Sequence, residues 1–323
     1  MNRKEFEMIC RASQEILKGY LNHKLKKEYE EVINNDGYLF AKGSVPILLV
    51  AHMDTVHEEL PKRFVYEDKG DKVSSPQGIG GDDRCGIYMI LEIIKKHKCS
   101  VLFCEDEEKG GIGATKFTKE DFIKDLDFNY MIELDRRGSK DAVFYDCDNE
   151  KFEDFITEDG DWKTAWGSFS DISILAPKIG CAAVNLSCGY YNAHTDKEYV
   201  ILSEMENNIE KVCKLIERTT EEDKFEYIER KWTSRGYYSS YYGSCYGGWS
   251  EAEFFGETEE EFEDFGMMGL YGVTFNNDEG QMDFKEVYAR SDYEAIGIFL
   301  SEHPNMTFAE IEVDFFGYDE YYM

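Results

Sequence analysis

The sequence predicts an α/β protein with a mixed, mostly parallel central sheet sandwiched by helices. The first observation behind this prediction is a set of short apolar runs, at 45–51, 100–104, 129–134 and 181–187. A continuous apolar run of this length is typical of a strand that is buried on both faces by covering helices. The second observation is that longer segments between and after these runs have helical periodicity. At 323 residues, the chain can hold one such domain and a smaller unit.

The first elements are a predicted helix at roughly 3–20 and a hairpin whose turn is the NNDG sequence at 34–37. The strand at 45–51 then leads directly to His52. A polar loop containing SSPQGIGG follows. The next helix is expected to begin near Asp82 and Asp83, because apolar residues recur at helical spacing at 87, 90, 91 and 94.

Three further strands are expected before a long helix closes this unit. The predicted strand SVLFC is followed by the loop EDEEKGGIGA, the strand NYMIEL is followed by Asp135, and the strand CAAVNLS is followed by a loop that contains His194. An amphipathic helix from about 203 to 230 follows. Each strand therefore delivers a carboxylate or a histidine at its carboxyl end or just beyond it. If the strands are parallel neighbours, these side chains meet in one crevice.

His52 and Asp54 form a His-x-Asp pair at the end of the first apolar strand. Residues i and i+2 of an extended chain point to the same face, so Asp54 can orient the His52 ring while the other ring nitrogen binds a metal. Taken alone, the pair fits a histidine that is simply satisfied at a strand end equally well, and any single acid fits a solvated loop charge. The repetition of such residues at several strand ends favours a metal site.

Composition argues against several classes of function. A formal net charge of −31 repels nucleic-acid phosphates and anionic membranes, so neither is expected as a partner. No run reaches the roughly 18 apolar residues of a membrane helix. The charged start MNRKEFEMIC shows no apolar signal region, so a cytoplasmic location is expected. The nine cysteines include no CxxC pair, which fits free thiols and argues against a thiolate zinc site.

An abrupt change of composition after residue 230 sets the predicted domain boundaries. Residues 1–232 are expected to form the catalytic domain, 233–265 a linker rich in Gly, Tyr and acidic residues, and 266–323 a small acidic α+β domain. From residue 251 onward the chain has 20 acidic and 2 basic residues. Docking of a protein partner, cover of the active-site edge, self-association and a purely structural role all stay open for this region.

Five motifs together make the chain resemble a known enzyme family. In order along the chain they are HMDTV, GGDDRCG, EDEEKGGIGA, ELDRRG and NAHTDKEYV. This series is similar to the two-zinc exopeptidase superfamily of the peptidase T and acetylornithine deacetylase type, with its glutamyl and leucyl aminopeptidase relatives. The resemblance covers residues 30 to 215 and implies a zinc exopeptidase-like fold.

The resemblance implies two metal ions that share one bridging carboxylate. The first ion would be held by His52, Asp82 and Asp135, and the second by Asp82, Glu108 and His194. Oxygen and imidazole ligands suit Zn²⁺, with Co²⁺ or Mn²⁺ as alternatives. Two such ions, roughly 3.5 to 4 Å apart, would polarise a scissile carbonyl and lower the pKa of a shared water. The resemblance also implies a cis peptide bond directly after Asp82.

Glu107 is implied as the general base, and Asp54 as the carboxylate that supports the first histidine. The acidic run at 105–108 leaves a second register open, in which Asp106 and Glu107 are the base and the ligand. The glycines and the alanine that follow favour Glu107 and Glu108 at the spacing of the family.

One departure from the peptidase T pattern concerns the substrate side. That family usually inserts a lid or dimerisation domain before the final histidine, but only 58 residues separate Asp135 from His194 here, so the lid is expected to be missing or vestigial. The GSFSDIS sequence resembles the substrate loop of compact leucyl aminopeptidases, which implies that Asp171 meets a substrate amino group. A helix cap is an equal alternative for Asp171. Arg136 and Tyr191 are further candidates for substrate contact.

These inferences predict a metal-dependent hydrolase of peptide or amide bonds, most simply an aminopeptidase or dipeptidase. The expected substrate is a small peptide or an acylated amino acid. An N-acyl-amino-acid deacylase with the same site is the alternative within this class. An acidic binding or decoy protein without turnover is the alternative of another class, although a pseudoenzyme would be expected to lose Glu107 or a ligand.

Overall fold

The computed structural model describes residues 1–230, the strands at 269–276, 282–289 and 311–318, and positions 295, 298, 299 and 303. The chain divides into two compact units, Met1–Lys231 and Trp232–Met323. The predicted linker at 233–265 lies outside the described residues.

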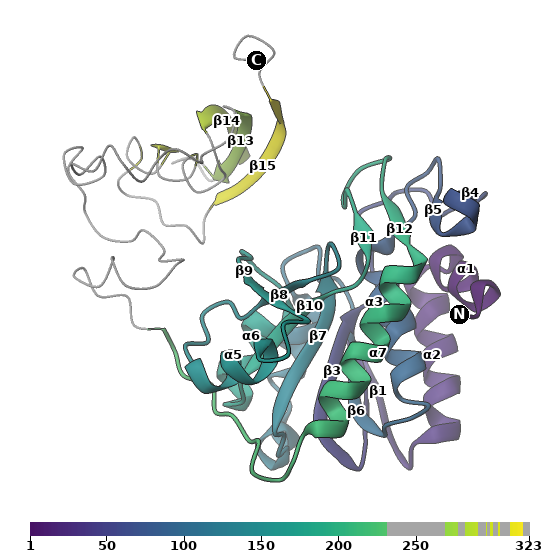
Figure 1. The fold of residues 1–323 in the computed structure, drawn as a ribbon, viewed down its shortest axis with the longest axis vertical. Helices are drawn as coiled ribbons and strands as arrows, with labels where there is room; N and C mark the ends of the chain where they lie inside the picture. The colour runs from purple at the N-terminus through teal and green to yellow at the C-terminus, as the bar shows by residue number, and fades with distance from the viewer. Residues whose placement is uncertain are drawn as a thin grey trace. The chain divides into compact units, whose positions relative to one another are not determined.

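An eight-stranded sheet forms the centre of the first unit (Figure 1). Its strand order is β1-β2-β6-β3-β7-β10-β8-β9, and the central strands β6, β3, β7 and β10 run parallel to one another. β2 and β8 pair antiparallel with the two ends of this parallel block. The strands are β1 (Glu31–Asn35), β2 (Tyr38–Lys42), β3 (Val45–His52), β6 (Cys99–Cys104), β7 (Tyr130–Arg136), β8 (Asp141–Val143), β9 (Lys163–Ala165) and β10 (Ala183–Ser187). The predicted fold class is confirmed.

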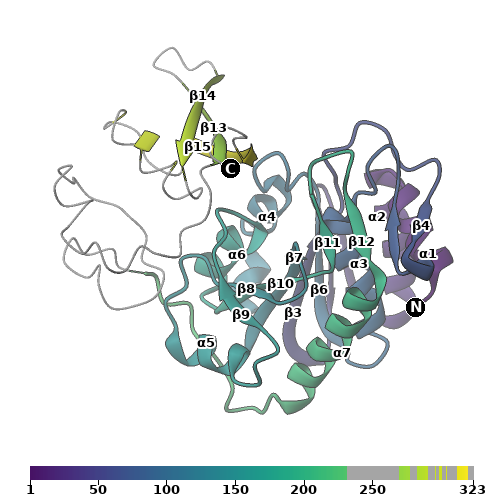
Figure 2. The same cartoon turned by 45° about the horizontal axis from the view of Figure 1, so that its top comes forward.

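Helices pack on both faces of this sheet (Figures 1 and 2). One hydrophobic core joins Leu49 and Ala51 of β3 to α1 (Arg3–Arg11), α2 (Gln14–Glu28), α3 (Gly81–Ile93), α5 (Glu150–Thr157) and α7 (Leu202–Arg218). The opposite core joins Leu48 and Val50 to α4 (Ile112–Phe117), the 3₁₀ turn η2 (Asp121–Asp125) and α6 (Asp171–Ile179). Because successive strand residues point to opposite faces, a strand buried on both sides must be apolar throughout, as the run 45–51 is.

Two helices differ from the sequence prediction. The N-terminal segment forms α1 and α2 instead of one helix, because the Ser13 side chain accepts the Ile16 N–H at 3.3 Å and caps a new helix. The last helix of the unit ends at Arg218 instead of near 230. Beyond it, the Asp223 carboxylate accepts the Thr220 N–H at 2.7 Å, which holds the chain in a local turn.

A second, four-stranded sheet of order β11-β12-β5-β4 was not predicted. Its strands are β4 (Val65–Glu67), β5 (Lys72–Ser74), β11 (Tyr190–Tyr191) and β12 (Tyr199–Ile201), and the 3₁₀ turn η1 (Asp68–Gly70) joins β4 to β5. Strands of two or three residues are too short to show a period of two in the sequence. The loop between β11 and β12 carries His194.

The second unit contains a three-stranded antiparallel sheet of order β14-β13-β15. Its strands are β13 (Gly269–Asn276), β14 (Met282–Ala289) and β15 (Ile311–Tyr318). These strands lie within 266–323, the range for which a small α+β domain is expected. Val273, Val287 and Phe299 are buried in a small core. In the part of the chain that the structure describes, no helix is long and apolar enough to cross a membrane.

Candidate metal centre

The carboxyl ends of three parallel strands meet at one edge of the large sheet. His52 is the last residue of β3 and is paired in register with Cys104, the last residue of β6. Glu107 and Glu108 follow β6 after two residues, and Asp135 lies one residue before the end of β7. Because neighbouring parallel strands end level, the loops after them open on the same crevice.

Asp82 and His194 reach this edge from outside the large sheet. Asp82 lies in the first turn of α3 with non-helical backbone angles, and the peptide bond to Asp83 is cis, as the resemblance implied. His194 lies in the loop between β11 and β12 and has a left-handed φ of 63°.

The first predicted metal triad is assembled around His52, whose side chain is buried. Its Nε2 lies 3.1 Å from Asp82 Oδ1 and 3.6 Å from Asp135 Oδ1. Its second ring nitrogen, Nδ1, lies 3.1 Å from Oδ1 of Asp54, the predicted supporting carboxylate. One potential ligand atom from each of His52, Asp82 and Asp135 lies within 4.8 Å of the others.

The second triad shares Asp82 with the first. His194 Nε2 lies 3.3 Å from Asp82 Oδ2 and 3.1 Å from Glu108 Oε1. Asp82 therefore turns one oxygen toward each histidine, which is the arrangement that a bridging carboxylate needs. Potential ligand atoms of these three residues also lie within 4.8 Å of one another.

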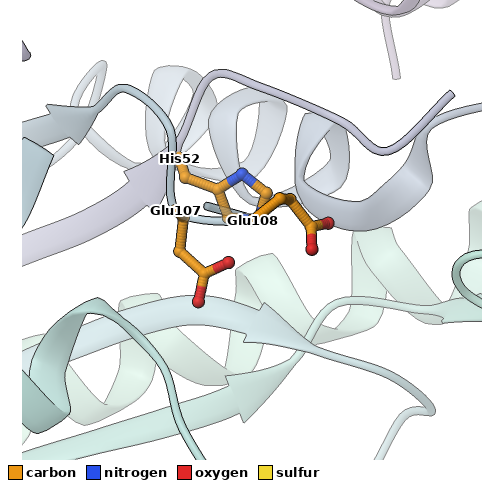
Figure 3. A group of neighbouring side chains, drawn as sticks. All are labelled: His52, Glu107 and Glu108. Carbon is orange, nitrogen blue, oxygen red and sulfur yellow. The ribbon is translucent and has the colours of Figure 1, made fainter. Parts of the chain in front are cut away.

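In the acidic turn after β6, Glu107 and Glu108 offer carboxylate oxygens that lie within 4.8 Å of each other and of a ring nitrogen of His52. Figure 3 shows the two side chains leaving the turn beside His52 in different directions. The neighbouring Asp106 instead pairs with Lys109 at 2.9 Å. Asp54 accepts the backbone N–H groups of Glu107 at 3.0 Å and Glu108 at 3.1 Å, so one carboxylate fixes both the turn and the first histidine.

Several solved structures of peptidases share this architecture. Aminopeptidase PepT from Bacillus cereus matches 66% of this chain and 96% of its own, with a TM-score of 0.54 and 16% identity. A tripeptidase from Staphylococcus aureus matches 65% and 95%, with a TM-score of 0.53 and 14% identity. A TET aminopeptidase from a Thaumarchaeota archaeon of marine sediment matches 68% and 98%, with a TM-score of 0.51 and 14% identity. The chain has the fold of these peptidases.

Comparison of sequences alone adds no relative, since no family model and no curated protein matches the chain. At identities of 14 to 16%, the structural likeness establishes the peptidase fold and leaves the activity to be argued from the site. The narrower resemblance to the peptidase T and acetylornithine deacetylase type stays a prediction.

The buried carboxyl groups at this edge of the large sheet favour the binding of cations. Burial raises the pKa of Glu107 to about 9, reinforced by the charges of Asp135, Asp171 and Glu108 and opposed by His52. Burial and the charge of Asp82 raise the pKa of Asp135 to about 8. Burial alone would lower the pKa of His52, but Asp135, Asp54 and Asp82 hold it well above the usual value. In the protein without metal, protons therefore neutralise carboxylates that cations would otherwise neutralise.

The donor set fits a metal. Glu108 Oε1 is buried and makes no hydrogen bond of normal geometry within the described residues, although His194 Nε2 lies 3.1 Å away. A buried carboxylate oxygen without a donor costs free energy unless a cation compensates it. The nearby carboxylates of Asp82 and Glu108 raise the pKa of His194 to about 11, which shows a high negative potential at this place. Imidazole nitrogens and carboxylate oxygens are ligands that Zn²⁺ prefers.

The three predicted substrate residues occupy different surroundings. Asp171, the first residue of α6, is fully buried, and burial raises its pKa to about 6. Arg136 pairs with Asp141 at 3.3 Å, and the Tyr191 hydroxyl donates to Glu204 at 2.5 Å. The polar groups of Arg136 and Tyr191 are thus engaged outside the two triads, whereas the charge of Asp171 acts directly on Glu107.

Sequence reasoning missed several polar residues that support the site. The Asn185 side chain accepts the Asp135 N–H at 3.0 Å and donates to its carbonyl at 3.2 Å. Glu133 is fully buried on β7 and accepts a hydrogen bond from Ser170. Glu198 is also fully buried and contacts the loop before α3. A carboxylate inside an apolar run was the available signal for Glu133, and the recognised NAHTDKEYV motif already contained Glu198.

Proposed function

We propose that the chain is a two-metal hydrolase that cleaves peptide or amide bonds of small peptides, as an aminopeptidase or dipeptidase. One observation carries this proposal: two triads of histidine and carboxylate ligands share Asp82, and Glu107 stands beside them. The fold shared with an aminopeptidase and a tripeptidase supports it.

In this proposal two Zn²⁺ ions occupy the triads, with Co²⁺ or Mn²⁺ as alternatives. Bound ions of this kind polarise a scissile carbonyl and lower the pKa of a water molecule. Three carboxylates, Asp82, Glu108 and Asp135, offset most of the charge of two divalent cations. His52 and His194 supply neutral nitrogen ligands once they have lost the protons that they hold in the metal-free protein.

Glu107 acts as the general base of the proposed reaction. Its carboxylate takes a proton from the attacking water and returns it to the leaving amine. Burial suits this role, because a carboxylate removed from water accepts a proton more readily than an exposed glutamate, and the positive charge of bound cations would release the proton that Glu107 holds in the metal-free protein. Asp54 holds the backbone of the turn, so the direction of the Glu107 side chain is fixed before substrate binds.

The substrate side of the proposal rests on Asp171, and Arg136 and Tyr191 stay candidates for further substrate contact. A free ammonium group gains energy near the buried Asp171 carboxylate, which is not one of the proposed metal ligands, whereas the neutral acyl group of an N-acylated amino acid does not. This difference favours an aminopeptidase over a deacylase. We therefore expect small peptides with a free amino terminus to be the preferred substrates, and neither nucleic acid nor membrane to be a partner.

The proposal is tested by metal analysis and by a Glu107→Gln variant. The purified protein should contain two zinc ions, and Glu107→Gln should keep them while losing roughly 100- to 10,000-fold in kcat, the usual contribution of a general base. Asp106→Asn, a change of the same kind one residue earlier, should retain activity, because Asp106 pairs with Lys109 instead of facing the triads.

The substrate panel should contain aminoacyl peptides, carboxy-terminal peptide substrates and N-acyl amino acids. Faster cleavage of N-acyl amino acids would replace the aminopeptidase with a deacylase. Bound metal without any Glu107-dependent hydrolysis across the panel would refute the enzyme and leave a silent acidic binding protein.

A further inference from the structure

Glu198 joins the two segments that carry Asp82 and His194. We propose that it is a positioning residue that holds the backbone of Asp82, and that His57 supports it from the side that is partly exposed. The inference rests on the proposed function, in which Asp82 bridges two metal ions. Glu198 itself would contact neither metal nor substrate.

Both oxygens of the Glu198 carboxylate are occupied. Oε1 accepts the Asp82 N–H at 3.0 Å, and Oε2 accepts the Gly80 N–H at 2.7 Å. His57 Nε2 lies 2.8 Å from the same Oε2. The Glu198 side chain is fully buried, while the His57 side chain is 10% exposed. A buried carboxylate is tolerated when donors surround it, and here two of the three donors are main-chain groups of the turn that presents Asp82.

The packing around Glu198 leaves its carboxylate little freedom. A Cβ on Gly81 would lie 2.8 Å from Tyr190 Cβ and 3.2 Å from Glu198 Oε1. A Cβ on Gly78, whose φ is +80°, would overlap the His57 ring at 2.1 Å. Bulkier residues at these two glycines would therefore push against Glu198 or its partner, which indicates a close fit of the two segments.

Glu198 lies close in the sequence to His194, a proposed metal ligand. Glu198 follows His194 by four residues and directly precedes β12. The Glu198 carboxylate thus connects the loop that carries His194 to the turn that carries Asp82. His194 and Asp82 must lie close together to form the second triad. Partners that orient metal ligands typically contribute 10- to 100-fold to metal affinity.

The test compares zinc affinity in Glu198→Gln and in a control, Asp196→Asn. Glutamine keeps the shape but turns an NH₂ group toward either the Asp82 N–H or the Gly80 N–H, so one donor faces another. We expect the zinc affinity of Glu198→Gln, measured by competition with a chromophoric chelator, to fall roughly 10- to 100-fold. Asp196→Asn removes the same charge from an exposed position in the same loop, and its affinity should equal that of the wild type.

Two further readouts separate positioning from a general loss of stability. The visible absorption spectrum of the cobalt-loaded protein should change in Glu198→Gln, because the ligand geometry at Asp82 changes. His57→Ala, which keeps both backbone hydrogen bonds, should lose less affinity than Glu198→Gln. A folded Glu198→Gln protein with wild-type zinc affinity and cobalt spectrum overturns the inference, even if it melts at a lower temperature.

The outcomes distinguish this inference from the function on which it rests. Wild-type protein that binds none of zinc, cobalt and manganese would refute the proposed function, whereas wild-type protein that binds two ions beside an unaffected Glu198→Gln would refute only the role of Glu198. If Glu198→Gln does not fold, hydrogen exchange of the wild-type protein decides. The Gly80 and Asp82 amides should then be protected without metal, and unprotected amides would contradict the proposed clamp.

Discussion

Asp54 organises the candidate site through three short contacts. One oxygen lies 3.1 Å from His52 Nδ1 and 3.0 Å from the Glu107 N–H, and the other accepts the Glu108 N–H at 3.1 Å. The same carboxylate therefore sets the orientation of the first histidine and the path of the turn that carries the base. Hydrogen bonds to the charged form lower the pKa of Asp54 despite its burial, so it is ionised at neutral pH.

Replacing Asp54 with asparagine should weaken metal binding although Asp54 belongs to neither triad. An amide supplies one accepting oxygen, so the NH₂ group of Asn would oppose one of the backbone donors. We expect a 10- to 100-fold loss of zinc affinity for Asp54→Asn, measured by chelator competition. Asp36→Asn, at an exposed carboxylate paired with Lys116, is the control. Equal affinities in both variants would show that Asp54 does not orient the ligand set.

The sequence indicated the residues of the two triads, but not most of the residues that support them. His52, Glu108 and Asp135 follow apolar strands, and parallel strands deliver such residues to one edge, so the pattern was readable. Glu198 and Asn185 act mainly on backbone N–H and C=O groups. Every residue except proline has a backbone N–H, so the sequence contains no partner residue that would reveal such a contact.

The contact between α3 and β7 fixes the distance between Asp82 and Asp135. Gly86 lies on the inner face of α3, where a Cβ would be 1.7 Å from the Leu134 carbonyl oxygen and 2.5 Å from Asp83 Oδ1. The helix can pack this closely on the strand only because residue 86 lacks a side chain. The closeness of two ligand-bearing elements thus depends on a glycine that is not itself part of the site.

Alanine substitutions at Gly86 and Gly19 should have opposite effects on stability. Gly86→Ala forces α3 away from β7 and should lower the free energy of unfolding by about 1–3 kcal/mol, as overpacking does. Gly19→Ala lies inside α2 with no atom within 4 Å of the added Cβ, and should raise it by about 0.5–1 kcal/mol. Urea unfolding of the metal-free proteins measures both, and a neutral Gly86→Ala would disprove the tight packing.

Elements with long apolar periods were predicted, and short or interrupted ones were not. The strand β3 is buried over six consecutive residues, which leaves a clear signal. The break between α1 and α2 depends on a single Ser13 cap, and its helical pattern continues on both sides. The four strands of the second sheet have two or three residues each, and the pairing of β12 with β5 joins segments that lie far apart in the sequence.

At the scale of the whole molecule, the interior of the first unit contains several carboxyl groups that are removed from water. Burial raises the pKa of Glu133 well above its usual value and that of Asp171 to about 6. Together with Glu107 and Asp135, Glu133 gives the metal-free protein a group of carboxyls that hold protons at neutral pH, whereas Asp171 has lost most of its proton at pH 7. Such a group links stability to pH.

Metal-free protein should lose stability as the pH rises from about 5 to about 9. Glu107 and Asp135 have folded pKa values of about 9 and about 8, above their unfolded values of 4.5 and 3.8. In this window the folded state holds protons that the unfolded state has released, so the free energy of unfolding falls as the pH rises. His194, with a pKa raised from 6.5 to about 11, acts in the same direction.

Thermal melts at pH 5, 7 and 9 after chelator treatment measure this effect. Zinc should remove most of the pH dependence, because cations replace the protons. Metal-free Asp135→Asn should show a shallower slope, because one titrating group is gone. A melting temperature of the metal-free wild type that rises between pH 5 and pH 9 would contradict the prediction.

In the proposed two-metal site, the shared Asp82 would make the two metal positions thermodynamically dependent on each other. Its two oxygens face different histidines, His52 and His194, so an ion in either triad constrains the carboxylate that the other ion needs. By reciprocity, the coupling free energy is the same whichever ion enters first. The proposed site therefore behaves as one cooperative binding unit, and a change that displaces Asp82 alters both binding equilibria at once.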